Sequence, residues 1–418
     1  MVREEIEIMA PVGSFESLMA AIQGGADSVY FGVQHLNMRA VSSGNFTLDD
    51  LTKITDICNK HKIKSYLTLN TILYDHDLGV MHKIVEAAKN SNVTAIIVAD
   101  QAAIFEARTK GIEIHISTQL NISNIEALKF YSQWADVVVL ARELTLPRIF
   151  GIYNAIQKDQ IKGPSGELIR LELFVHGALC MAISGKCYMS LHENNASANR
   201  GACQQTCRKS YIVTEKETGY ELEVDNEYIM SPKDLLTIHF LNKIIDSGIR
   251  VLKIEGRARS PEYVKTVVSC YNEAVLSIID GTYGEGKNKK WKKRLSTVFN
   301  RGFWDGYYLG SKSGEWSHRY GSQATKRKVY LGKGNNYFQK IGIAEFFVES
   351  GSLQVGDEIL VTGPTTGVIQ TVVSEIRVNK KIVMQTRKGD YFSIPISSVI
   401  RRSDKLYKIV PANQTIQQ

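Results

Sequence analysis

The sequence has no run of apolar residues that approaches the roughly 20 needed to cross a bilayer as a helix. Its first residues, MVREEIEIMAPVG, lack the apolar segment of a secretory leader. Six cysteines in 418 residues are too sparse for the disulfide framework of a small secreted domain. These absences predict a cytoplasmic protein that does not contact the membrane.

Several catalytic and nucleotide-binding motifs are also missing. The chain contains no G-x-S-x-G, H-E-x-x-H or aspartic-protease motif, so none of these peptidase arrangements is indicated. No G-x-G-x-x-G follows the first apolar run, which disfavours an open, doubly wound dinucleotide-binding sheet.

Eight near-continuous apolar runs alternate with amphipathic stretches up to residue 260, as is typical of parallel strands buried on both faces. Eight such runs joined by crossovers predict a (β/α)₈ TIM-like barrel, with the open doubly wound sheet as the alternative. The runs are EIEIMAP near Ile6 and residues 27–33, 63–70, 95–100, 113–119, 136–142, 171–177 and 250–256.

The spacing of the runs predicts the domain organisation. A long insertion after the seventh strand, at about 178–249, holds four of the six cysteines, and long connections of this kind on barrels are usually functional. After the eighth strand we expect a long amphipathic helix and then a basic linker, KNKKWKKR at 287–294. We predict a barrel domain at 1–320 and a small antiparallel β-barrel domain at 326–412.

The positive charge is concentrated at one end of the chain. Residues 326–418 hold 14 Lys and Arg against 7 Asp and Glu, a net charge of +7 out of the formal +8 of the whole chain. A basic module attached to a nearly neutral body indicates a polyanionic partner.

Polar side chains end several predicted strands, where the active sites of barrels lie. Together they predict a pocket for a small polar or anionic molecule. Arg142 and Arg257 could present bidentate donors to a carboxylate, unless they pair with Glu143 and Glu255. These strand-end residues are Asn70, Asp100, Thr118, Gln119, Arg142, His176, Lys253, Glu255 and Arg257.

The clustered cysteines follow the pattern C-x6-C-x15-C-x3-C, from Cys180 through Cys187 and Cys203 to Cys207. Soft thiolates select zinc or iron–sulfur clusters, and structural zinc sites favour two tight pairs, of which only Cys203–Cys207 qualifies. The spacing leaves iron–sulfur, zinc and incidental thiols open. His176, four residues before Cys180, is a ligand, a hydrogen-bond donor to the site or a buried histidine.

The stretch ELFVHGALCMAISGKCYMS resembles the signature of the collagenase-like peptidase family (peptidase family U thirty-two). The opening MAPVGSFESLMAAIQGGADSVYFG and the stretches NRGACQQTCR, KIEGR and RGFWDGYY look like the same family. Within this family the chain is most similar to bacterial tRNA hydroxylation proteins. The resemblance implies that Cys180, Cys187, Cys203 and Cys207 hold a [4Fe–4S] cluster.

The resemblance further implies prephenate-dependent, oxygen-independent hydroxylation of a wobble uridine to 5-hydroxyuridine in a tRNA anticodon loop. Arg142, His176, Lys253, Glu255 and Arg257 would be the catalytic or substrate-binding residues, with prephenate or a similar carboxylate as co-substrate. Some relatives act as pairs of paralogues, so a paralogous partner subunit is a further expectation.

The C-terminal segment also resembles the second β-barrel domain of translation elongation factors. With its positive charge, this favours contact with RNA phosphates. Trp291 in the basic linker could stack on a base, or the linker is simply a solvated run of charge. The candidate phosphate contacts are Lys326, Arg327, Lys328, Arg401 and Arg402.

Two other functions stay open at this stage. The family name implies a peptidase, in which Cys180 would be the nucleophile and His176 its base. The second alternative is an RNA-binding protein whose long insertion is held together by zinc.

Overall fold

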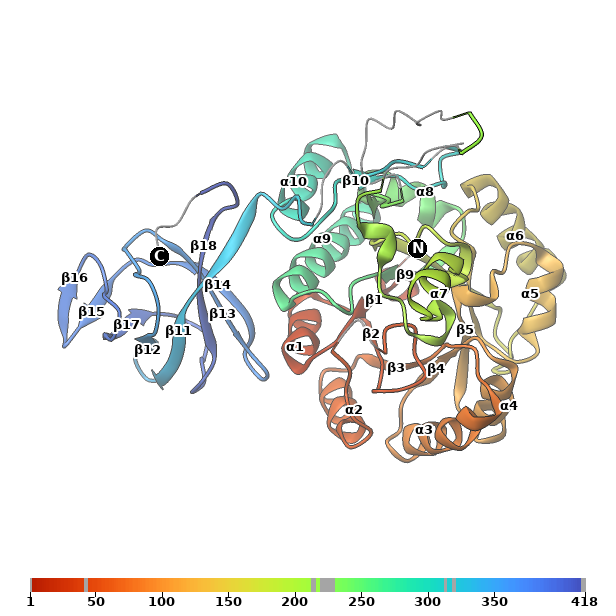
Figure 1. Ribbon diagram of the computed structural model, residues 1–418, viewed down its shortest axis with the longest axis horizontal. Helices are drawn as coiled ribbons and strands as arrows, with labels where there is room; N and C mark the ends of the chain where they lie inside the picture. Colours follow the sequence, from red (N-terminus) through yellow and green to blue (C-terminus); the bar gives the residue numbers. More distant parts are fainter. Residues whose placement is uncertain are drawn as a thin grey trace.

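The computed structural model describes residues 2–40, 44–211, 216–218, 230–311, 314–317 and 321–414. Eight parallel strands form a closed barrel, because the last strand, β9, pairs with both β1 and β7 (Figure 1). The predicted TIM-like barrel is confirmed. Its strands are β1 (Glu7–Pro11), β2 (Ser28–Phe31), β3 (Lys64–Leu69), β4 (Ala95–Val98), β5 (Glu113–Ile116), β6 (Val137–Val139), β7 (Arg170–Gly177) and β9 (Ile249–Ile254).

Helices surround the barrel and bury their apolar faces against the strands (Figure 1). Helix α1 shows how local sequence sets their limits: the Ser14 side chain accepts a hydrogen bond from the Ser17 N–H, and Gly25 ends the helix in the left-handed region with φ of 85°. The barrel helices are α1 (Phe15–Gly24), α2 (Asp50–Lys60), α3 (Leu78–Asn90), α4 (Gln101–Thr109), α5 (Ile125–Ser132), α6 (Leu146–Asp159), α8 (Leu241–Asp246) and α9 (Pro261–Ile279).

The segment between β7 and β9 carries the clustered cysteines. It contains the short helix α7 (Tyr188–Asn194) and strand β8 (Asp234–Leu236), which runs antiparallel to the end of β7 and pairs with β10 (Phe303–Trp304). Because β7 and β9 pair directly with each other, this segment lies outside the closed ring of strands.

The segment at 287–294 is part of a helix, so its interpretation as a linker is wrong. Helix α10 (Glu285–Leu295) packs Trp291 and Leu295, four residues apart, into the barrel core. The Trp291 indole N–H donates to Glu273 at 2.9 Å, and its side chain is buried, so it cannot stack on a nucleic-acid base. The lysines that suggested a linker occupy the opposite, solvated face of the helix.

The C-terminal domain is an antiparallel β structure, as predicted. Its eight-stranded sheet has the order β14-β13-β18-β11-β12-β17-β15-β16 and a core of its own around Phe346 and Phe392. The strands are β11 (Lys326–Phe338), β12 (Ile343–Val348), β13 (Glu358–Gly363), β14 (Gly367–Val372), β15 (Ile376–Val378), β16 (Lys381–Val383), β17 (Tyr391–Pro395) and β18 (Lys405–Pro411).

The C-terminal domain docks on α1 and α9 of the barrel through β14 (Figure 1). The Gln23 side chain donates to the Thr366 carbonyl and accepts from the Val368 N–H, both at 2.9 Å. Lys265 donates to the Val368 carbonyl at 2.7 Å. Side-chain amide and ammonium groups thus satisfy backbone groups of β14, which joins the two domains by specific hydrogen bonds.

Within the described ranges, no helix is both long and apolar enough to span a bilayer.

Candidate active site at the mouth of the barrel

A cavity of about 180 Å³ opens at the C-terminal ends of the barrel strands, beneath the cysteine-bearing insertion. All four clustered cysteines line it, so residues up to 27 positions apart in the chain share one surface. The predicted strand-end residues that also line it are Asn70, Thr118, Gln119, Arg142, Lys253, Glu255 and Arg257.

Two predicted strand-end residues do not line the cavity. Asp100 caps helix α4 by accepting from the Ala102 N–H at 2.9 Å, and it also accepts from the Leu73 N–H. His176 lies behind the mouth among the rings of Tyr263, Tyr271 and Phe303.

The four thiols of the insertion are free. Burial raises the pKa of Cys207, the Arg208 guanidinium opposes this rise, and the thiols of Cys180, Cys203 and Cys187 add to it. The four thiols line one cavity and are soft donors, so they could hold zinc or an iron–sulfur centre.

Arg208 fixes the position of the cysteine segment. Its guanidinium donates to the Leu179 carbonyl at 2.7 Å, the Pro232 carbonyl at 2.8 Å and the Ser231 hydroxyl at 2.9 Å. Burial lowers its pKa to about 10, well above neutrality, so the side chain keeps its charge beside Cys207.

Glu255 is the acidic side chain of the mouth and is bound from two sides. Arg39 donates to one carboxylate oxygen at 2.9 Å, and the Tyr30 hydroxyl donates to the other at 3.1 Å. Burial alone would raise the pKa of Glu255, but Arg39 and Arg257 hold it below its ordinary value. Glu255 therefore stays ionised and positions Arg39.

Arg257 and Arg142 differ in how much of their hydrogen-bonding capacity the protein uses. Arg257 is 5% exposed and donates to Asn37 and Thr68, each at 3.0 Å, instead of pairing directly with Glu255. Arg142 stands 5.6 Å from the Phe174 ring, and the described residues give it no hydrogen bond or ion pair. Its planar fork is available to a ligand carboxylate.

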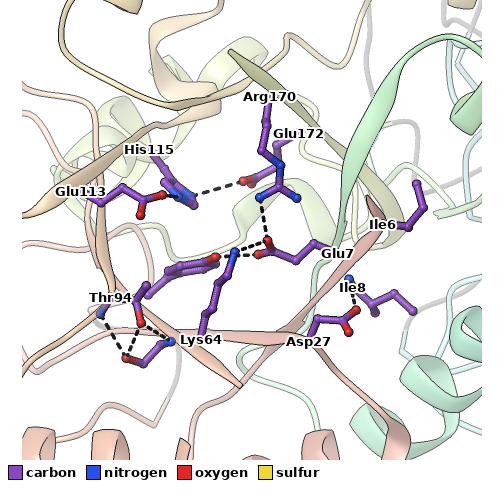
Figure 2. A network of polar contacts seen from close by, with 12 residues as sticks. Ile6, Glu7, Ile8, Asp27, Lys64, Thr94, Glu113, His115, Arg170 and Glu172 are labelled. Atoms are coloured by element: carbon purple, nitrogen blue, oxygen red, sulfur yellow. Dashed lines mark hydrogen bonds and ion pairs between the residues drawn. The ribbon is translucent and has the colours of Figure 1, made fainter. Parts of the chain in front are cut away.

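Lys253 connects the mouth to the interior of the barrel. Its ammonium donates to the Glu172 carboxylate at 2.6 Å, and the two side chains are 5% and 0% exposed. Glu172 is one end of a network of charged side chains that continues toward the N-terminal ends of the strands (Figure 2).

His176 is not placed to act as the base of a cysteine nucleophile. Burial among aromatic rings, with a smaller contribution from Arg259, lowers its pKa to about 3. Its Nδ1 faces the Tyr271 hydroxyl at 3.5 Å. Cys180, in contrast, lines the cavity, from which His176 is absent.

Four cationic residues of the mouth were missed in the sequence: Arg39, Arg208, Arg259 and Arg301. Arg208 directly follows Cys207, and Arg301 is the first residue of the family stretch RGFWDGYY. Both positions could therefore have been recognised in the sequence as candidates for the site. Arg39 lies in a loop with no such pattern. Among the described lining residues, these four, Arg142, Lys253 and Arg257 make seven cations against one acid, Glu255.

The candidate phosphate contacts do not form one free patch. Lys326 pairs with Glu358 at 2.5 Å, and Lys328 pairs with Glu262 of the barrel at 2.8 Å. Arg327 donates to the Gln414 carbonyl, and Arg401 donates to Thr366 at 3.0 Å. Arg327, Arg401 and Arg402 are all exposed, and of these three only Arg402 has no hydrogen bond or ion pair among the described residues.

The model of peptidase family U32 matches residues 13–318, and the chain belongs to this family. It is 59% identical to a protein of Porphyromonas gingivalis named "Collagenase", over 97% of this chain and 98% of that one. It is 31% identical to "tRNA hydroxylation protein P1" of Bacillus subtilis, over 90% and 88% of the two chains. It is 32% identical to "23S rRNA 5-hydroxycytidine C2501 synthase" of Escherichia coli, over 74% of this chain and 46% of that one.

The family resemblance inferred from the sequence is therefore confirmed. Relatives of this chain include proteins named for tRNA and rRNA hydroxylation, and relatives of higher identity carry the name collagenase.

Proposed function

We propose that this chain is an RNA-modifying enzyme that hydroxylates the wobble uridine of tRNA to 5-hydroxyuridine, with prephenate as co-substrate and without molecular oxygen. The observation that carries the proposal is that four free thiols and seven cationic side chains line one cavity. Soft donors suit a redox metal centre, and the excess of positive charge suits a carboxylate beside a nucleotide.

We prefer an iron–sulfur cluster to a single zinc ion as the group that the four thiols would hold. Tetrahedral zinc with Zn–S bonds of about 2.3 Å draws its thiolates to about 3.8 Å from one another. Among the described residues, no three His, Cys, Asp or Glu side chains are gathered closely enough to bind one ion. A cluster assigns each thiolate its own iron, so its ligands stand farther apart. A [4Fe–4S] cluster bound by Cys180, Cys187, Cys203 and Cys207 would supply electron transfer or substrate activation.

The chain's own residues then bind and orient the substrates. Arg142 offers two parallel donors to a carboxylate of the co-substrate, and Lys253 presents an ammonium from the cavity floor. Glu255 holds Arg39 in place, while Arg257 is fixed by Asn37 and Thr68. The basic C-terminal domain would contact RNA backbone phosphates, and a flipped base of the anticodon loop would enter the cavity.

The test is expression in a bacterium that lacks its own tRNA hydroxylation proteins, followed by mass spectrometry of tRNA nucleosides. We expect 5-hydroxyuridine derivatives with the natural chain and none with the double variant Cys203→Ala/Cys207→Ala. The anaerobically purified natural chain should hold roughly four irons. Cys270→Ala is the matched control, because Cys270 is buried in α9 away from the cavity. A colourless, zinc-containing protein without nucleoside modification would overturn the proposal.

A peptidase is the second candidate, because a protein of 59% identity is named collagenase. The separation of His176 from the cavity weighs against a Cys180–His176 pair. Digestion of gelatin by the same preparations decides this point: cleavage that survives removal of iron and is lost in Cys180→Ala would establish the peptidase.

A further inference from the structure

A file of titratable side chains runs through the barrel interior from the cavity to the opposite end, and Figure 2 shows three of them, Glu172, His115 and Glu113. It begins at Lys253, which lines the cavity, and continues through Glu172 and His115 to Glu113. Glu113 is the first residue of β5 and its side chain is 39% exposed, whereas those of Glu172 and His115 are 0% exposed. Only the last member of the file therefore meets solvent at the N-terminal end of the barrel.

The contacts along this file are continuous except at one point. Lys253 Nζ lies 2.6 Å from Glu172 Oε1, and His115 Nε2 lies 3.1 Å from Glu113 Oε1. Between them, His115 Nδ1 and Glu172 Oε2 are 3.8 Å apart. This separation exceeds a hydrogen bond by about 1 Å, which a small side-chain rotation closes.

The two atoms at this gap are both buried and without a hydrogen-bond partner among the described residues. Leaving two buried polar atoms unsatisfied is costly, and such groups call for an explanation other than packing. They face each other, one on an imidazole and one on a carboxylate, which are the side chains that most readily pass protons near neutral pH.

We propose that Glu113, His115, Glu172 and Lys253 form a proton path that links solvent at the N-terminal end of the barrel to the cavity at its mouth. The path rests on the function proposed above only in that a reaction in the cavity takes up or releases a proton. It gives Glu172 and His115 a role in proton transfer, although neither touches the cavity.

One proton enters and one leaves in each passage. Glu113 takes a proton from solvent and gives it to Nε2 of His115, whose ring releases the proton on Nδ1 to Oε2 of Glu172. The Glu172 carboxyl turns about its last bond and gives this proton to Lys253, which has given one to the cavity. A turn of the imidazole resets the path, and the reverse order carries a proton outward.

The other polar groups around His115 do not belong to the path. The Tyr66 ring lies 4.5 Å from the imidazole, and its hydroxyl donates to Glu7 at 2.7 Å. Glu7 is bound by Arg170 at 3.0 Å and Lys64 at 3.1 Å. With its charge compensated in this way, Glu7 is a fixed carboxylate that favours a positive charge nearby.

The first test needs no catalysis. In the natural chain with ¹⁵N-labelled histidine, we expect the His115 ring N–H to exchange with water too fast to give a separate proton signal. Glu113→Gln cuts the link to solvent and should make a slowly exchanging ring N–H visible. A ring N–H of His115 that is already protected for hours in the natural chain would overturn the path.

The second test uses the hydroxylation assay on tRNA with prephenate. His115→Gln should slow single-turnover hydroxylation at least tenfold without changing iron content or tRNA affinity, and Glu113→Gln, at the surface, should do the same if His115→Gln does not fold. Tyr66→Phe is the control and should keep the natural rate. Rapid ring exchange without hydroxylation would retain the path and reject the proposed reaction, whereas full activity in both variants would reject the path.

Discussion

The two ends of the barrel contain similar residue types in opposite arrangements. At the mouth, cations outnumber the single acid Glu255 among the described lining residues, which also give Arg142 no hydrogen bond or ion pair. At the N-terminal end, Glu7 lies between Arg170 and Lys64 and accepts from Tyr66, so positive and negative charges are matched (Figure 2). The mouth therefore has an excess of positive charge, whereas the charges at the other end balance one another.

This difference in charge balance distinguishes residues that are available to a ligand from residues that stabilise the fold. Removing a cationic partner from a buried carboxylate lowers the stability of the folded protein, because the charge is left without compensation. An unpaired, partly exposed arginine contributes little to folding, and its hydrogen-bonding capacity is kept for a ligand.

The largest expected effect is on the pair that joins the two ends. Glu172→Ala leaves the Lys253 ammonium nearly buried without a carboxylate, and should lower the free energy of unfolding by about 3–5 kcal/mol. Urea denaturation measures this loss. The double variant Glu172→Leu/Lys253→Met should recover most of it, because no unpaired charge is left; a double variant as unstable as Glu172→Ala would contradict the assignment.

The next effect separates the two ends directly. Arg142→Ala should weaken binding of prephenate by about 100-fold, or about 2.7 kcal/mol, and change the unfolding free energy by less than about 0.5 kcal/mol. Arg170→Ala should do the reverse: about 1–3 kcal/mol of lost stability and unchanged binding. Isothermal titration calorimetry and urea denaturation of both variants measure the contrast, and equal effects at the two sites would remove the distinction.

The smallest expected effect is a pH dependence of stability that comes from His176 and is set against His115. His115 lies between carboxylates, whereas His176 lies among aromatic rings, where burial lowers its pKa to about 3. The unfolded chain protonates this histidine below about pH 6.5, so stability is full above that pH and falls as the pH drops toward 3. Between pH 6.5 and 5 the loss should be about 2 kcal/mol. His176→Phe should remove this part of the pH dependence, and an unchanged slope would contradict it.

The sequence predicted the barrel because its strands are buried on both faces and therefore read as continuous apolar runs. The prediction of a linker at 287–294 was wrong, because six lysines and arginines in α10 concealed the helical spacing of the buried Trp291 and Leu295. The mouth was predicted in part: strand-end residues and clustered cysteines could be recognised, but the loop residue Arg39 could not.

The interior network was missed for a different reason. Four charged residues of the network are the first residues of their strands: Glu7, Lys64, Glu113 and Arg170. In the sequence, a charged residue at this position indicates only that the strand begins at the protein surface. Only closure of the barrel turns these residues toward one another, and that closure depends on pairings between distant segments.

The direct pairing of β7 with β9 has a consequence for the order in which the parts of the protein form. The ring of strands closes without any contribution from the segment that carries the cysteines, so formation of the barrel does not depend on that segment. If the cysteines hold a metal centre as proposed, it could be loaded onto a scaffold that has already folded, with Cys180 exposed to solvent.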